Sequence, residues 1–333
     1  MKTIILKKTS IHRRIADVRQ NYFQLHHVSR FAWSIIRGVL IAGISFIILY
    51  PLFVKLSLSF MAERDLYDTT VRYVPRNFTF ENYIMVWKFL DYPKAFTNSF
   101  LLSMMVSSLQ LMSCTIVAYG FARFKFPLKN LWFGLVILTL VIPPQTIMIP
   151  LFLHFRYFDL LGIFERIIGR SFNMLDSYWP FVLMSITSVG LKNGLYIYII
   201  RQFFRGMPKE LEEAAYVDGS GIFKTFSVIM LPSAVPIMIT AFLFSFVWQW
   251  NDTFFSTLFL NRLVVLPTTL SALAQNVNQY FFWQTGQAGN TPPVYLSMLN
   301  NTGSILVILP LVIIYVFAQR YFVESIERSG LVG

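Results

Sequence analysis

The sequence predicts an all-α, polytopic membrane protein with six transmembrane helices, and three observations support this fold class. Of the 333 residues, 56% are hydrophobic and only 13% are charged, whereas soluble domains carry about 25% charged residues. Six segments are apolar over roughly the 20 residues that a helix needs to cross a bilayer. Basic residues are concentrated before the first of them, which is typical of a chain oriented by positive charge. A soluble enzyme, a disordered chain and a disulfide scaffold around the single Cys114 are therefore disfavoured.

The predicted spans follow from hydropathy alone. In chain order they cover residues 33–58, 98–121, 131–153, 178–200, 234–258 and 302–317. Glycine and proline interrupt several of them, including Pro51 in the first and Pro143 and Pro144 in the third. Backbone groups that these residues free must find partners in neighbouring helices or in a water-filled cavity.

The distribution of Lys and Arg predicts the orientation of the chain. The tail 1–30 and the loop 122–130 together hold ten basic residues and one acid, whereas 61–95 holds five of each and 154–177 three of each. Both termini and 201–233 are therefore expected in the cytoplasm, with 61–95, 154–177 and 259–301 outside. This divides the chain into a basic cytoplasmic tail, 1–30, and a six-helix transmembrane domain, 31–333. Because the net charge of +12 is concentrated beside a span, the expected partner is membrane lipid and not nucleic acid.

The fourth predicted span is the most interrupted. It reads WPFVLMSITSVGLKNGLYIYII, with Lys192 and Asn193 between Gly190 and Gly194. Two interpretations remain open. One is a hinge near the cytoplasmic end, from which Lys192 reaches the interface. The other is a broken helix that lines a transport cavity.

The segment 201–232 is predicted to form a helix–turn–helix on the cytoplasmic face. Pro208 suits the first position of a helix, and acidic residues follow it in the early turns. Leu211, Ala214 and Ala215 form a short apolar stripe, and Gly219 or Gly221 can end the helix in a left-handed conformation.

The rest of this segment predicts a second helix and a partner. Ser220 can cap a helix over residues 222–230, which Pro232 closes. Interfacial helices that lie in lipid usually carry Lys and Arg on the polar face, whereas the first helix here carries acids. Its small, acidic surface is better suited to a groove in another protein.

The same segment resembles the EAA loop of ATP-binding-cassette (ABC) importer permeases. That pattern is Glu-Ala-Ala, three residues, Gly, nine residues, Ile, one residue and Leu-Pro, and a chance match has a probability on the order of 10⁻⁸ per starting position. Flanking stretches, including ARFKFP, VPRNFTFENY and the C-terminal QRYFVESIERSGLVG, resemble the carbohydrate (maltose-type, type I importer) branch. The matching positions, with every spacing kept, are Glu213, Ala214, Ala215, Gly219, Ile229, Leu231 and Pro232.

The resemblance implies a permease subunit that moves a sugar or oligosaccharide from an extracellular solute-binding protein into the cytoplasm. It implies a second permease and two ATP-binding subunits as partners, with 201–232 as the coupling loop of the 31–333 transmembrane domain. Glu213 would then make the polar contact in the ATPase groove, Ala214 and Ala215 would allow close seating, and Gly219 would supply the turn beside Asp218.

The chain itself is predicted to be neither an enzyme nor a holder of a cofactor. It contains no Gly-x-x-x-x-Gly-Lys-Ser/Thr phosphate loop, so ATP and Mg²⁺ are expected in a partner ATPase. Its four histidines show no metal-ligand spacing, and no metal site is predicted.

The substrate path is expected among polar residues of the fourth and fifth spans: Lys192, Asn193, Gln249 and Asn251. Beside them, Trp248 and Trp250 are interpreted chiefly as an aromatic belt at the outer interface. The outer segment 261–301 contacts the solute-binding protein or folds over the cavity mouth, two options that remain equal.

Two other functions are compatible with this scaffold. The first is the same type of importer with a non-sugar solute. The second is an ion-coupled transporter, which usually shows several acids within its spans, whereas Asp252 is the only one here.

Overall fold

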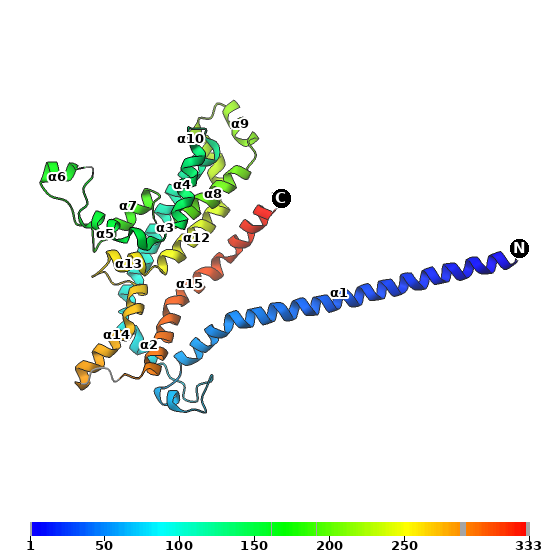
Figure 1. The fold of residues 1–333 in the computed structure, drawn as a ribbon, viewed down its shortest axis with the longest axis horizontal. Coiled ribbons are helices and arrows are strands. Elements are labelled where there is room, and N and C mark those ends of the chain that lie inside the picture. The colour runs from blue at the N-terminus through cyan, green and yellow to red at the C-terminus, as the bar shows by residue number, and fades with distance from the viewer. Residues whose placement is uncertain (1, 161, 191, 287–290, 331–333) are drawn as a thin grey trace.

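The computed structural model describes the backbone of residues 2–160, 162–190, 192–286 and 291–330 as an assembly of helices (Figure 1). Its side chains are described within residues 29–319, so those of the predicted basic tail before Ser29 lie outside the described set, as do residues 331–333. The elements are α1 Lys2–Ser59, η1 Glu63–Tyr67, α2 Glu81–Phe89, α3 Tyr92–Arg123, α4 Lys129–Val141, η2 Pro144–Ile147, α5 Met148–Arg156, α6 Ile163–Ile168, α7 Trp179–Ile186, α8 Asn193–Gly206, α9 Glu210–Val217, α10 Ile222–Thr225, η3 Phe226–Met230, α11 Leu231–Ser233, α12 Val235–Trp250, α13 Phe254–Phe259, α14 Leu266–Thr285 and α15 Pro293–Gly330. No strand occurs among the described residues, and the all-α prediction is confirmed for them.

Helix α3 lies at the centre of the molecule and packs against α7, α8 and α12. One face of α3 carries Ala95, Ser99, Ser103 and Ser107 at intervals of four residues, and all four are buried. Small residues at this spacing let neighbouring helix backbones approach closely, which is how helices associate in a membrane. The sequence of α3 therefore builds a helix that others can surround.

Three hydrophobic clusters follow one another along α3. The first, at its N-terminal end, joins Tyr92 to α2, α12, α14 and α15. The second is built around Val106 with α5, α7 and α13. The third holds Cys114 and Ala118 against α8, η3 and α12. Because all three clusters include α3, a displacement of this helix disturbs the whole core.

Among the described residues, three helices are long and apolar enough to cross a membrane: Ser29–Ser59 within α1, Tyr92–Arg123 and Pro293–Gln319. Two further pairs qualify only jointly, Lys129–Val141 with Pro144–Arg156, bent by 99°, and Ile222–Ser233 with Val235–Trp250, bent by 75°. These five match the first, second, sixth, third and fifth predicted spans. The bends coincide with prolines, whose rings clash with the preceding turn and which lack a backbone donor.

The fourth predicted span is divided into α7 and α8. Ser188 and Lys192, between the two helices, have positive φ angles of 58° and 61°, which end regular α-helix in this sequence. The break expected around Lys192 is therefore present, and the crossing of the membrane by this sixth, broken span stays a prediction.

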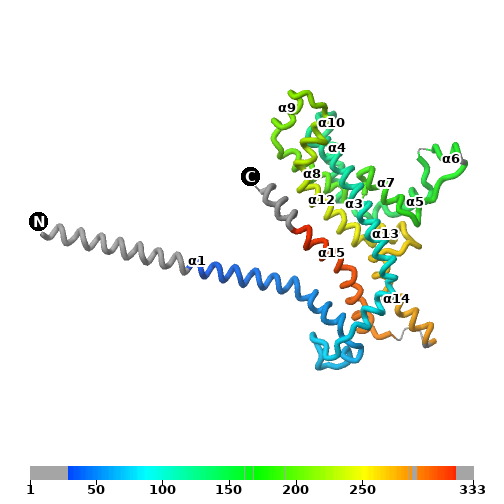
Figure 2. The backbone as a smooth tube through the Cα atoms, turned by 180° about the vertical axis from the view of Figure 1, so that it is seen from behind, coloured from blue at the N-terminus to red at the C-terminus, as the bar shows by residue number. Residues whose placement is uncertain are grey.

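Helix α1 leaves the helical body and projects away from it (Figures 1 and 2). None of its apolar 18-residue window is buried. Near its C-terminal end α1 contacts α15, where the Lys55 Nζ donates a hydrogen bond to Asn301 Oδ1 at 3.0 Å. Isolated apolar surface of this extent is stable only when lipid or another protein covers it.

The two ends of the body carry different elements. Helices α9 and α10 lie at one end, next to α4 and α8, whereas α2 and α14 lie at the opposite end (Figure 1). The segment predicted to contact a partner therefore forms one extremity of the molecule.

Candidate functional site

The first helix of the predicted helix–turn–helix is α9, and its end has a defined turn geometry. Gly219 adopts a φ of +77°. The Gly219 N–H donates to Tyr216 O at 3.0 Å, and the Ser220 N–H donates to Ala215 O at 2.9 Å. These two bonds form the Schellman motif, whose left-handed position favours glycine. Of the two glycines considered from sequence, Gly219 is thus the one that ends the helix.

The start and the apolar stripe of α9 differ from the prediction. The helix begins at Glu210, and Pro208 precedes the capping residue Lys209 instead of taking the first helical position. Glu212 and Ala215 are buried, whereas Leu211 and Ala214 are exposed. The inward face is therefore rotated from the predicted stripe, because a buried polar contact, described below, turns Glu212 toward the body.

The residues predicted to couple the chain to an ATPase fall into three environments. Glu213, Ala214, Asp218, Gly219 and Pro232 are exposed. The other members of the set lie inward: Ala215 is buried, and Ile229 and Leu231 are half-buried. The exposed side of the turn also presents Val217 and Phe223, with 87% and 89% of their surfaces accessible. Two apolar side chains so open to solvent beside a carboxylate form a surface suited to a protein partner.

The second helix is shorter and less regular than expected. Gly221, and not Ser220, is the capping position, and no side-chain cap bond is formed there. Regular α-helix covers Ile222–Thr225, and Phe226–Met230 forms a π-helical turn before α11. Pro232 lacks the N–H that would donate to Val228 O in an α-helix. The helix therefore widens into a π-helical turn before Pro232, and it does not end there as predicted.

A buried polar cluster joins α9 to the C-terminal end of α3, and sequence reasoning missed it. The Tyr119 hydroxyl donates to Glu212 Oε1 at 2.8 Å, and Arg123 Nε forms an ion pair with Glu212 Oε2 at 3.2 Å. Only 7% of the Arg123 side chain and 10% of the Glu212 side chain are accessible. Arg123 Nη2 also donates to Met207 O, just before α9, at 2.9 Å. The available signal was a second acid beside Glu213 and an arginine directly after the second span.

A second polar group lies among α3, α7, α8 and α12, at the break of the fourth predicted span. Gln110, Asn193 and Gln249 are all buried there, and the side-chain amides of Asn193 and Gln110 lie 2.9 Å apart. Gln110, Ser185, Gly190 and Gln249 line a small cavity of about 10 Å³. That volume is about the minimum that holds one water molecule. The Gln249 Nε2 is buried and has no hydrogen-bond partner among the described residues.

Of the four residues predicted for the substrate path, the structure brings two together, Asn193 and Gln249, which both lie near Gln110. The Lys192 Nζ lies 5.0 Å from the ring centroid of Trp248, next in the chain to Gln249. Asn251 is exposed and its side chain donates to Val247 O at 2.8 Å, away from the cavity. Trp250 is fully buried and its Nε1 donates to Val307 O at 3.1 Å. The aromatic-belt interpretation is thus wrong for Trp250, because α15 covers it.

Comparison with known proteins gives this geometry a context. Residues 111–328 match the family described as binding-protein-dependent transport system inner membrane component. The arabinooligosaccharides transport system permease protein AraQ of Halalkalibacterium halodurans is 28% identical over 297 residues, 88% of this chain and 94% of that protein. The osmoprotective compounds uptake permease protein GgtD of Synechocystis sp. is 31% identical over 241 residues, 72% of this chain and 70% of that protein.

The family model covers well over half of the sequence. The chain belongs to this family of ABC transporter permeases.

A solved structure supports the fold of the permease. A bacterial ABC transporter involved in the import of the acidic polysaccharide alginate has a chain that aligns with a TM-score of 0.67 at 20% identity, covering 88% of this chain and 98% of that one.

The permease is an integral membrane protein and a non-catalytic component, and ATP hydrolysis takes place in a separate subunit. Family membership contradicts the ion-coupled alternative. The family match includes α9 and the Tyr119, Arg123 and Glu212 cluster, but not α1 or the loop after it.

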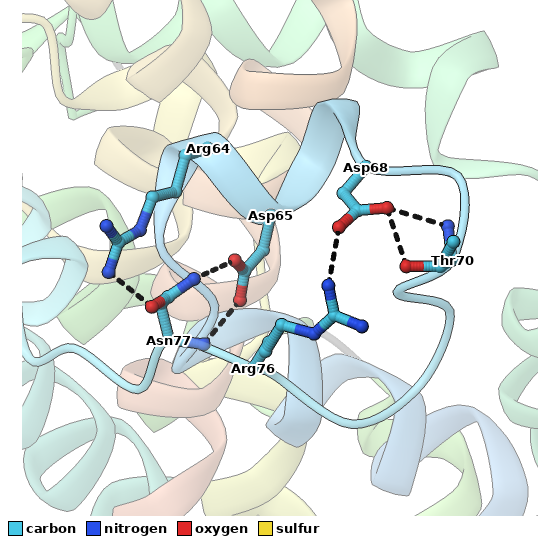
Figure 3. Close-up of polar contacts among 6 residues, drawn as sticks. All are labelled: Arg64, Asp65, Asp68, Thr70, Arg76 and Asn77. Carbon is cyan, nitrogen blue, oxygen red and sulfur yellow. Dashed lines mark hydrogen bonds and ion pairs between the residues drawn. The ribbon is translucent and has the colours of Figure 1, made fainter.

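That loop, residues 62–80, is organised by two carboxylates (Figure 3). Asp65 is buried, accepts a hydrogen bond from the Asn77 N–H at 2.7 Å and a second from the Asn77 side chain, which in turn accepts one from Arg64. Burial acts to raise the pKa of the Asp65 carboxyl, but the bonds from Asn77 and the charge of Arg64 outweigh it and hold the pKa below its usual value.

The second carboxylate in the loop is Asp68. It accepts hydrogen bonds from the Thr70 hydroxyl at 2.7 Å and the Thr70 N–H at 2.9 Å, and it forms an ion pair with Arg76 at 3.1 Å. These Thr70 bonds first, and the Arg76 charge with them, lower the pKa of Asp68. The loop of the permease is thus held by ionised side chains.

Proposed function

We propose that this permease moves a sugar or oligosaccharide from an extracellular solute-binding protein into the cytoplasm, driven by ATP hydrolysis in two partner subunits that bind ATP and Mg²⁺. The similarity to AraQ, named for arabinooligosaccharides and aligned over 88% of this chain, supports the sugar class. The similarity to GgtD, which is named for osmoprotective compounds, favours a second candidate: a small osmoprotective solute carried on the same scaffold.

The coupling role is assigned to α9 and the turn after it, facing the cytoplasm with both termini of the chain. The observation that carries this assignment is the surface formed by exposed Glu213 and Ala214 next to the highly accessible Val217 and Phe223. Glu213 would contact a basic or hydrogen-bonding group in an ATPase groove, while the small Ala214 lets the two backbones approach. A partner bound there stabilises whichever arrangement of the permease it binds more tightly.

The bare apolar surface of α1 supports a second permease as a partner. All large apolar side chains of this helix from Phe31 to Phe53 are exposed, and 0% of its most apolar window is buried. We assign this surface to a contact with the second permease and with lipid, because a single helix projecting alone has no other way to bury its side chains.

The substrate path is assigned to the break between α7 and α8. Gln249, Gln110 and Asn193 meet there as buried hydrogen-bonding groups inside an apolar bundle. Buried polar groups within a membrane are costly, which makes them markers of a path for a polar solute. Opening of the bundle at this break would enlarge the present cavity.

Uptake into vesicles tests the solute class. The permease, reconstituted with its ATPase and partner permease, is supplied with ATP inside and with the binding protein outside, loaded with a labelled arabino-oligosaccharide or with glycine betaine as an osmoprotectant. We expect ATP-dependent accumulation of the oligosaccharide. Accumulation of glycine betaine alone would replace the sugar class by the second candidate.

Charge reversal tests the coupling surface. Glu213→Lys should abolish ATP-driven uptake and release the ATPase on purification, while the permease stays in the membrane. Glu81→Lys, an exposed reversal at the first residue of α2 at the opposite end of the body, is the matched control and should retain the ATPase. Gly219→Ala should lower uptake partially, because a left-handed backbone costs a residue with a Cβ about 1–2 kcal/mol. Normal uptake by Glu213→Lys would remove the coupling role from this surface.

A further inference from the structure

We propose that Glu212, held by Tyr119 and Arg123, makes α9 and α3 move as one rigid body during transport. This inference rests on the proposed docking of α9 with the ATPase and assigns the next step, the route by which that motion enters the membrane bundle. The four residues Tyr119, Arg123, Met207 and Glu212 are named here the Glu212 clasp. Glu212 is thereby a positioning residue for transport.

The two adjacent glutamates of α9 have different surroundings. Glu213 is exposed, as a contact to another subunit requires, whereas Glu212 has only 8% of its surface accessible. Successive residues on a helix are about 100° apart, so one short helix can hold the body with one carboxylate and a partner with the next. The acidic pair therefore divides into an outward and an inward contact.

Each oxygen of Glu212 has its own partner on α3. Oε1 accepts from the Tyr119 hydroxyl at 2.8 Å, and Oε2 lies 3.2 Å from Arg123 Nε. With both ion-pair partners nearly inaccessible, water screens the attraction between Arg123 and Glu212 little. The Arg123 Nε makes no hydrogen bond among the described residues, so the directional contact to Glu212 is the hydrogen bond from the Tyr119 hydroxyl. Two contacts to different oxygens fix the rotation of α9 as well as its distance.

The partners on α3 are themselves immobilised. The Tyr119 ring packs against Phe204 of α8 and Phe226 of η3, with ring centroids 5.4 and 4.7 Å apart. Arg123 also donates to Met207 O at 2.9 Å, which attaches the chain just before α9 to the same side chain. Both the entry to α9 and its first turns are consequently attached to the end of α3.

The position of the clasp along the fold explains why it matters. It lies in the last turns of α3, the helix that takes part in all three hydrophobic clusters and packs against α7, α8 and α12. A force on α9 that reaches α3 therefore reaches the polar cavity around Gln110. Replacement of a buried ion pair by apolar residues often leaves stability unchanged, so burial alone does not require charges here. The directional contact is what an apolar pair would lack.

A distance measurement tests the rigid connection. Spin labels are placed at Glu210→Cys on α9 and at the exposed Met112→Cys on α3, in a Cys114→Ala background, and the full transporter is studied without nucleotide and trapped with ATP and vanadate. With the clasp intact, the 112–210 distance should be the same in both states. With Glu212→Gln, the distance in the trapped state should shift or its distribution should broaden.

Transport provides the second readout. Glu212→Gln and Tyr119→Phe should each lower the amount of arabino-oligosaccharide moved per ATP hydrolysed, by about 2- to 30-fold, the usual range for residues that carry coupling. Both variants should keep the ATPase bound, unlike Glu213→Lys, so failure of the clasp and failure of docking are distinguishable. Glu81→Gln, at an exposed glutamate that begins α2 at the opposite end of the body, is the matched neutral control and should keep the wild-type ratio.

A double variant in which residues 212 and 123 exchange their charges distinguishes loss of the clasp from misfolding. If Glu212→Gln is lost from the membrane, the double variant Glu212→Arg with Arg123→Glu restores an ion pair and should recover the unchanged 112–210 distance. The proposal is overturned if Glu212→Gln and Tyr119→Phe keep both the wild-type transport ratio and the fixed distance. It is also overturned if Glu212→Gln releases the ATPase, because the clasp would then only shape the docking surface.

Discussion

Trp248 and Trp250 are two positions apart near the end of α12, yet they have different surroundings. Trp248 is 46% exposed and lies beside Lys192, whereas Trp250 is fully buried and donates to α15. Glu212 and Glu213 show the same contrast on α9. The two members of each pair are the same residue type and differ only in the helix that lies next to them. The direction in which a side chain leaves its helix therefore decides its role.

The buried amide of Gln249 leads to a prediction about the cavity. Gln249→Leu removes a donor that has no described partner, a defect that costs about 1–3 kcal/mol when buried. We therefore expect thermal unfolding in detergent at an equal or higher temperature and slower solute uptake in vesicles. Gln202→Leu, an exposed glutamine in α8, is the control and should leave uptake unchanged. Unchanged uptake by Gln249→Leu would show that the cavity lies off the path.

At the scale of elements, α4 and α8 approach closely at one glycine. A Cβ at Gly194 would lie 2.7 Å from Val136 O and 2.8 Å from Thr139 Oγ1. Because a backbone atom is the obstacle, Gly194→Ala must separate the helices and should cost about 1–3 kcal/mol of unfolding free energy, measured as a lower melting temperature. The matched control is Gly134→Ala in α4, where nothing lies within 4 Å and the change should be neutral or stabilising. Equal melting of the two variants would contradict the close approach.

The loop 62–80 has a predicted dependence on pH. Asp65 and Asp68 have folded pKa values below their ordinary value of 3.8, so they bind fewer protons folded than unfolded. Their stabilisation is present above that ordinary value and is lost as the pH falls through the lower folded values. We expect an acid-active protease to cleave Asp68→Asn faster than the wild type within this loop at pH about 5, and the two rates to converge well below 3.8. A constant ratio of rates would exclude the carboxylate as the cause.

At the scale of the whole molecule, the body and α1 are joined only locally. The C-terminal part of α1 contacts α15, α2 and the loop 62–80 through bonds that include Lys55 to Asn301 and Asn82 to the Ser59 carbonyl, whereas residues 29–53 of α1 are exposed. The Glu212 clasp and the proposed coupling surface lie at one end of the body. The proposal therefore gives the molecule two partner surfaces, one at that end for an ATPase and one along α1 for the second permease.

Photo-crosslinking tests the second of these surfaces. A photoreactive side chain placed in turn at residues 44–47 samples every side of α1, since four residues complete about one helical turn. In the assembled transporter we expect adducts with the second permease at one or two of these positions. Lipid adducts at all four positions would mean that α1 lies alone in the bilayer.

The features that sequence alone determined are those that depend on local chemistry. Hydropathy identified α1, α3 and α15 as long apolar helices, because the apolar residues that make each segment suited to lipid lie within that segment. Pro143 and Pro144 located the 99° bend, and Gly219 and Gly221 narrowed the end of α9 to two positions, because backbone sterics depend on residue type and not on neighbours. The structure then selected Gly219. The spacing of the Glu-Ala-Ala segment identified the family for the same reason, since it is a pattern within one short stretch.

Only the tertiary structure decided which side of each helix is covered. Tyr119 and Glu212 are 93 positions apart. A second acid beside Glu213 and an arginine after the second span are signals of a possible ion pair, but neither segment specifies that the two meet. The predicted stripe on α9 failed for that reason, since an ion pair with Arg123 turned a carboxylate inward where apolar periodicity favoured Leu211. The prediction for Trp250 was wrong for the same reason, because α15, the helix that buries it, is distant in the sequence. Contacts between distant segments depend on how whole helices pack, and this information is absent from any single stretch of sequence.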